Sequence, residues 1–139
     1  MIRSFRGAAP VVPDSAFASE SALVMGAVTL GERCGVWPGA IIRGDFAHIR
    51  IGSGTLIEDN VVVHTGRDMT IGDDVIVGHG AVVHCRSIGR NSLIANSPVG
   101  DRLGDLENPS ILSRNRPGRS IECRCISNSA RRSEVSATP

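Results

Sequence analysis

The chain has 139 residues, of which 41% are hydrophobic and 3% aromatic, and its 15 basic and 14 acidic residues give a net charge of +1. This length suits one domain, and the balanced charge gives no electrostatic reason to expect a nucleic-acid or membrane partner. Because aromatic side chains are scarce and 16 glycines are present, we expect a core of small and β-branched residues in short strands joined by tight turns.

The N-terminal segment, residues 1–6, carries two arginines, and no long apolar run follows it. It therefore predicts neither a secretory signal nor a membrane span, and we expect the protein in the cytoplasm. The four cysteines are too few and too irregularly spaced to predict a disulfide framework.

An aliphatic residue returns about every six positions from residue 12 to residue 94, as hexapeptide repeats require. The series is Val12, Ala18, Val24; Leu30, Val36, Ile42; Ile51, Ile57, Val63; Ile71, Val77, Val83; and Ile88, Ile94. We therefore predict an all-β fold, a parallel β-helix with three hexads per coil. Each aliphatic residue should point into a narrow prism and stack on its equivalent one coil away, about 4.8 Å apart. Glycine and asparagine are expected at the corners.

Two coils exceed 18 residues, and we expect their extra residues, 46–48 and 66–68, to form outward loops; His48 would then be solvated. From residue 98 onward the six-residue period is lost. We therefore expect a β-helix domain over residues 1–100. Residues 101–139 should form an irregular segment that is poorly ordered or loosely packed on the open end of the coil stack.

The positions of three histidines within the hexads predict a shared metal site. His64 and His84 both take the second place of a third hexad in consecutive coils, so they should stack on one edge of the prism. His79 takes the third place of a second hexad, on a different face, and can join them only from a neighbouring molecule. A cyclic trimer would supply this arrangement three times, with the fourth metal position left for water.

Two sequence motifs carry a resemblance to a known family. Val61-Val62-Val63-His64 and Gly78-His79-Gly80-Ala81-Val82-Val83-His84 match a metal-ligand pattern, and Ile42-Arg43-Gly44-Asp45 matches an Arg-Gly-Asp segment. With these motifs, residues 10–97 resemble the γ-class carbonic anhydrases, which are left-handed β-helix proteins. The resemblance implies left-handed coils, a homotrimer with metal sites at its interfaces, and reversible hydration of carbon dioxide to bicarbonate. The three imidazoles suit Zn²⁺, and also Fe²⁺ or Co²⁺.

Four further residues are expected to contribute to the site. Arg43 should pair across the interface with Asp59, which takes the same hexad place as His79 one coil earlier. Asp45 is expected to accept a hydrogen bond near the metal-bound water, and Glu58 should lie within reach of that water. Zinc lowers the pKa of bound water to about 7, far below that of bulk water, which produces the hydroxide that attacks carbon dioxide.

Three departures from the family pattern leave alternatives open. Glu58 stands where characterised members carry glutamine, the acidic loop that supplies a shuttling glutamate is missing, and the chain has no tyrosine. One alternative is a metal-binding or assembly protein of the same fold without turnover. Another is a hexapeptide acyltransferase, although a transferase would need one histidine free to act as a base.

Overall fold

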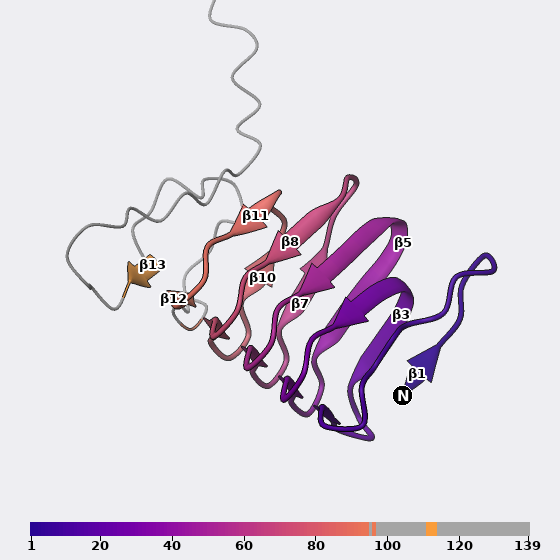
Figure 1. Ribbon diagram of the computed structural model, residues 1–139, viewed down its shortest axis with the longest axis horizontal. Coiled ribbons are helices and arrows are strands. Elements are labelled where there is room, and N and C mark those ends of the chain that lie inside the picture. The colour runs from indigo at the N-terminus through magenta and orange to yellow at the C-terminus, as the bar shows by residue number, and fades with distance from the viewer. Residues whose placement is uncertain (95, 97–110, 114–139) are drawn as a thin grey trace, which may run out of the picture.

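The computed structural model describes residues 1–94, 96 and 111–113. The chain winds into a parallel β-helix whose coils succeed one another along the long axis (Figure 1). The first sheet contains β1 (Ile2–Arg3), β3 (Leu23–Leu30), β5 (Ile41–Ile51), β7 (Val62–His64), β8 (Met69–Ile71), β10 (Val82–Val83) and β11 (Ser87–Ile88). The second sheet contains β2 (Phe17–Ala18), β4 (Gly35–Val36), β6 (Leu56–Ile57), β9 (Ile76–Val77), β12 (Ser92–Ile94) and β13 (Ile111–Ser113).

The strands form three faces of a prism. The first face joins the C-terminal half of β3 and β5 to β8 and β11, and the second face is the second sheet. The third face joins the N-terminal half of β3 and β5 to β7 and β10. The long strands β3 and β5 therefore pass from the third face to the first without interruption, whereas later coils use two separate strands.

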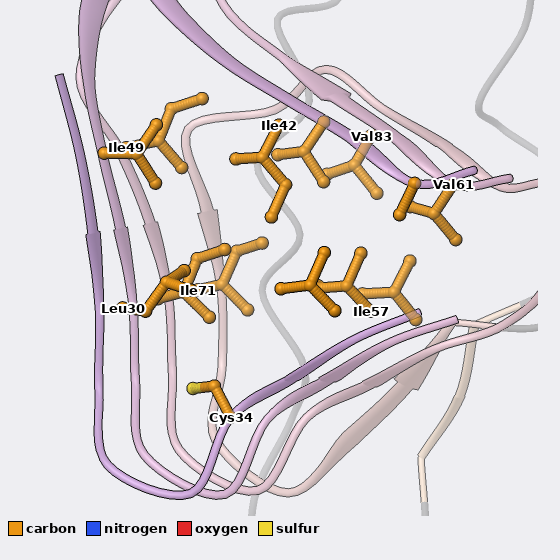
Figure 2. Close-up of a cluster of buried hydrophobic side chains, with 14 of the residues drawn as sticks. Leu30, Cys34, Ile42, Ile49, Ile57, Val61, Ile71 and Val83 are labelled. Carbon is orange, nitrogen blue, oxygen red and sulfur yellow. The ribbon is translucent and has the colours of Figure 1, made fainter. Parts of the chain in front are cut away.

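The interior of the prism confirms the predicted repeat. Residues that the six-residue period makes equivalent are paired in register, such as Ile42 with Val63 and Val63 with Val83. Upstream, Val24 pairs with Ile42, which confirms the leading coil. These side chains are fully buried in rows that run along the prism (Figure 2). Burial of each such side chain stabilises the fold by about 1.5–3 kcal/mol. The contacts between equivalent residues of successive coils therefore hold the stack together.

The corner between the second and third faces uses the left-handed backbone region in three successive coils. Gly39, Asn60 and Gly80 have φ of 72°, 57° and 68°, and glycine and asparagine tolerate this region best. The corner is also crowded, because a Cβ on Gly39 would lie 2.3 Å from Oδ1 of Asn60. The predicted use of glycine and asparagine at the corners is therefore confirmed here.

The predicted loop at residues 46–48 is wrong. These residues lie inside β5, and four residues of this strand, 45–48, stand opposite Ala27 of β3. The two strands pair on both sides of this bulge, so the extra residues bend the strand outward without ending it. Residues 66–68, in contrast, do lie between strands β7 and β8, as predicted.

The C-terminal end of the coil stack is covered by β13, which pairs antiparallel with β12. This pairing satisfies the backbone edge that the last strand of the second sheet would otherwise present. The other residues of the predicted irregular segment, 101–110 and 114–139, lie outside the described part of the chain. Among the described residues, no helix is long and apolar enough to cross a membrane.

Candidate metal centre

Two of the predicted ligands lie side by side on the outer surface of the third face. Arg43 pairs in register with His64, and His84 follows Val83, which pairs with Val63. Because strand side chains alternate between inside and outside, the row Arg43, His64 and His84 points outward while its neighbours fill the core. The rings of His64 and His84 have centroids 5.6 Å apart and are tilted by 48°. Their place on one edge of the prism is therefore as predicted.

His64 is held by the bulged part of β5. Its Nε2 lies 3.0 Å from Oδ1 of Asp45, and the ring of Phe46 meets its ring edge-on at 6.0 Å. The other carboxylate oxygen of Asp45 lies 3.3 Å from Nε of Arg43. Only 12% of the Asp45 side chain is exposed, so this carboxylate sits in a largely covered position between a guanidinium and an imidazole.

The Arg43 side chain has an unusual environment. Its Nε is buried and makes no hydrogen bond, although Asp45 is close, because the contact lacks hydrogen-bond alignment. The side chain as a whole is 44% exposed. Only this exposed part of the side chain can meet a further acceptor beyond this chain.

A second cluster lies at the corner where the second face meets the third. Asp59 and His79 each precede a left-handed corner residue in successive coils, and the Gly80 N–H donates to the Asp59 carbonyl oxygen at 2.8 Å. Nδ1 of His79 lies 3.0 Å from Oδ2 of Asp59 and 3.7 Å from Oε2 of Glu58. The ring of His79 is 56% exposed, so its other nitrogen is accessible.

The two clusters are separate. Within the described residues, the close group of three metal-ligating side chains consists of Glu58, Asp59 and His79, and it includes neither His64 nor His84. His79 precedes the corner at Gly80, whereas His84 follows β10 at the other edge of the third face. A zinc–nitrogen bond is only about 2.0–2.1 Å long, so one chain cannot bring all three histidines to one ion.

The structure also places Glu58, Arg43 and His48, the other residues whose positions the sequence predicted. The structure places Glu58 near His79, and it places Arg43 beside Asp45 of the same chain. The prediction of a solvated His48 is wrong, because its Nε2 lies 2.9 Å from Thr29 Oγ1 and its backbone N–H donates to Asp68. The sequence predicted that His48 lies in a loop, whereas it lies in strand β5.

The sequence prediction missed an apolar row on the outside of the third face. The row runs parallel to the histidine row, two residues earlier in each strand, and two of its members, Ile41 and Val82, are 37% and 42% exposed. Its members are Leu23, Ile41, Val62 and Val82. Reading the residue that precedes each interior aliphatic would have revealed it. The row lies between the edge that carries His84 and the corner that carries His79.

Several known proteins are similar to this chain. It is 41% identical over 83 residues to gamma carbonic anhydrase 2, mitochondrial, of Arabidopsis thaliana. This match covers 54% of this chain and 30% of that protein. It is 34% identical over 101 residues to a carbonic anhydrase of Geobacillus kaustophilus. This match covers 71% of this chain and 56% of that protein. The chain thus spans less than two thirds of the length of these relatives. No family model matches it.

A solved structure supports the fold. The structure of a hexapeptide transferase family protein from Anaplasma phagocytophilum covers 70% of this chain and 80% of its own, with a TM-score of 0.50 and 23% identity. At this identity the likeness concerns the architecture alone, which is the left-handed β-helix of hexapeptide proteins.

Proposed function

Because the chain belongs to the γ-carbonic anhydrase-like family of hexapeptide-repeat β-helix proteins, we propose that it is a metal-dependent enzyme. The proposed reaction is the reversible hydration of carbon dioxide to bicarbonate. The proposed ligands are His64 and His84 of one chain and His79 of the partner subunit. The observation that carries this proposal is the division of the three histidines between two edges of one face.

The division of the ligands supports a cyclic assembly. The paired imidazoles occupy one edge of the third face, and His79 occupies the opposite corner. A ring in which one edge of each chain meets the other edge of the next would complete one site per interface. The ring that we propose is a homotrimer with all the third faces turned toward one axis, as the similarity to γ-class carbonic anhydrases implies. The exposed apolar row between the two edges would then be covered by its own copies.

The donor set fits a transition metal. Three neutral imidazoles suit tetrahedral zinc with one open position, and Fe²⁺ and Co²⁺ accept the same donors. The exposed part of the Arg43 side chain, which is 44% accessible, also fits an interface, and Asp59 of the partner subunit is the proposed acceptor. Such a bidentate pair would fix the orientation of the subunits more than it would add stability.

The chemistry divides between the metal and the chain. When bound, the metal would supply the Lewis acidity that makes water a nucleophile at neutral pH. Glu58, whose side chain is 21% exposed and lies beside His79, would accept the proton that leaves and pass it to buffer. Asp45 is placed to accept a hydrogen bond on the side of His64.

A second candidate is a metal-binding or assembly protein without turnover. The observation that favours it is the carboxylate of Glu58, which adds a negative charge 3.7 Å from a proposed ligand. A nearby negative charge opposes loss of a proton from water and would slow the reaction at neutral pH.

The deciding experiment is stopped-flow carbon dioxide hydration by zinc-loaded protein, compared with His79→Ala and with the control His48→Ala. We expect catalysis by the parent and by His48→Ala, and the buffer rate for His79→Ala. A parent that binds one zinc per chain but hydrates carbon dioxide at the buffer rate would support the second candidate. If the parent bound no metal, both metal-based functions would fail and an acyltransferase would be the alternative to test.

A further inference from the structure

The most exposed large apolar residue of the described part of the chain stands beside the candidate metal centre. Phe46, in the bulged part of β5, is 69% exposed, and its ring meets the His64 ring edge-on at a centroid distance of 6.0 Å. We propose that Phe46 is an assembly residue whose ring packs on the apolar row of the partner subunit. This inference rests on the proposed function for the cyclic arrangement of the chains, but the contact itself needs no metal.

The bulge explains how a phenylalanine comes to stand at this edge. Phe46 has no partner in the register of β5 with β3, β7 or β8, so its side chain does not belong to an inner or an outer row. Bulges re-aim side chains and are common beside functional sites. Here the ring is directed toward His64, on the outer surface of the third face.

A single exposed apolar residue needs no explanation by itself, but Phe46 has an apolar counterpart at the other edge of its face. The order across the third face is the left-handed corner, the apolar row, the histidine row and the bulge. In a ring, the bulge of one chain meets the corner of the next, so an aromatic ring and an apolar row come together at every interface. An unrelated protein that covered Phe46 would also cover His64 and so prevent the ring. The partner is therefore a second copy of this chain.

The proposed ligands indicate which residue of the row receives the ring. His79 and His84 belong to the same coil, so an ion that they share across the interface would place equivalent coils at equal heights. Phe46 is then level with its own coil in the partner subunit. In that coil Ile41 follows the corner at Gly39 by two residues and is 37% exposed. Ile41 of the partner subunit is therefore the proposed contact.

The test is sedimentation velocity of the full chain over a range of concentrations, in chelator and with zinc. We expect the parent to assemble in both. Phe46→Ala should raise the concentration at which half of the chains are assembled by about tenfold or more, as loss of an aromatic anchor does. Phe46→Leu keeps an apolar side chain and should stay close to the parent. Phe17→Ala is the matched control, because Phe17 is 54% exposed but lies in β2 on the second face, and it should assemble like the parent.

A double-mutant cycle tests the counterpart, with circular dichroism to show that each variant is folded. Ile41→Ala should also weaken assembly, and the double variant should be weakened less than the product of the two single effects, by about twofold or more. Phe46 and Ile41 are too far apart along β5 to touch within one chain, so this coupling would arise between chains.

Three results would overturn the inference: parent-level assembly of Phe46→Ala, independent effects of the two substitutions, or a parent that is monomeric in chelator. An assembled parent that depends on Phe46 but binds no zinc would instead contradict only the proposed function.

Discussion

Two adjacent rows of the third face follow different rules. The inner row, Ile42, Val63 and Val83, repeats one chemistry in every coil and is almost fully buried. The outer row, Arg43, His64 and His84, lies one residue further along the same strands. Stacking in this interior row favours aliphatic side chains. It places no such demand on the outer row, so the paired imidazoles there need an explanation other than folding.

The largest expected effect separates these two rows directly. Val63→Asp places an unpaired carboxylate in the interior, where Val63 is fully buried, and should cost at least about 4 kcal/mol of unfolding free energy. His64→Asn changes the next residue, which points outward, and should cost less than about 1 kcal/mol. Urea unfolding followed by circular dichroism measures both. Similar losses for the two variants would contradict the division into inner and outer rows.

A substitution at the bulge between β3 and β5 should have a second, smaller effect on the unfolding free energy. Gly26 has a φ of 78°, and a Cβ there would lie 2.3 Å from the Gly44 carbonyl oxygen. Gly26→Ala should therefore lower the unfolding free energy by about 2–4 kcal/mol, since both the backbone and the contact must change. Gly66 has no atom within 4 Å of such a Cβ, so Gly66→Ala serves as the control. Equal thermal stability of the two variants would show that the bulge is not a rigid part of the coil.

A chain that ends at residue 100 tests whether the coil stack is an independent unit. It lacks β13 and so exposes the edge of β12, but stacking between neighbouring coils supplies most of the stability of a repeat protein. We expect the far-ultraviolet β signal to persist, with a loss of only about 1–2 kcal/mol, comparable to a few backbone hydrogen bonds. Loss of the β signal would mean that the C-terminal segment is required for folding.

The smallest expected effect concerns Cys34, an interior residue whose thiol ionises less readily because it is buried. Burial raises the pKa of the Cys34 thiol above its ordinary value, so the unfolded chain loses this proton at a lower pH than the folded chain. Its contribution to stability is therefore complete below about pH 8.5 and falls as the pH rises from there. The slope is at most about 1.4 kcal/mol per pH unit.

The comparison is between the parent and Cys34→Ala, because the chain has neither lysine nor tyrosine to titrate in the same range and the other three cysteines are common to both proteins. Urea unfolding between about pH 8 and 10 should show a shallower decline for Cys34→Ala than for the parent. Identical slopes would mean that the thiol ionises equally in both states.

The sequence predicted the inner rows because a six-residue aliphatic period has one structural solution, a prism with stacked equivalents. It also placed His64 and His84 on one edge, since their position follows from counting along that period. The bulge at residues 45–48 was not predictable in this way. An insertion adds residues to a coil, but counting cannot distinguish a loop from a bulged strand, and His48 was misplaced for that reason.

The partners of the polar residues were harder to predict than their rows. The proximity of Asp59 and His79 follows from their equivalent places, but the choice of Nδ1 as the contacting atom depends on side-chain rotation. Arg43 and Asp45 lie two residues apart in β5 and contact each other, but the further contact of Asp45 with His64 depends on side-chain rotation in the same way. Neither detail is contained in the spacing of residues along the chain.

The central claim, that the metal site is shared between chains, is tested most directly by mixing two inactive variants. His64→Ala and His79→Ala should each bind no zinc at the interfacial site. After dissociation and reassembly of equal amounts, about one quarter of the parent's zinc should be recovered, because one interface in four then combines an intact edge from each variant. Zinc bound by either variant alone at the parent's level, or no recovery in a mixture shown to form mixed oligomers, would contradict the shared site.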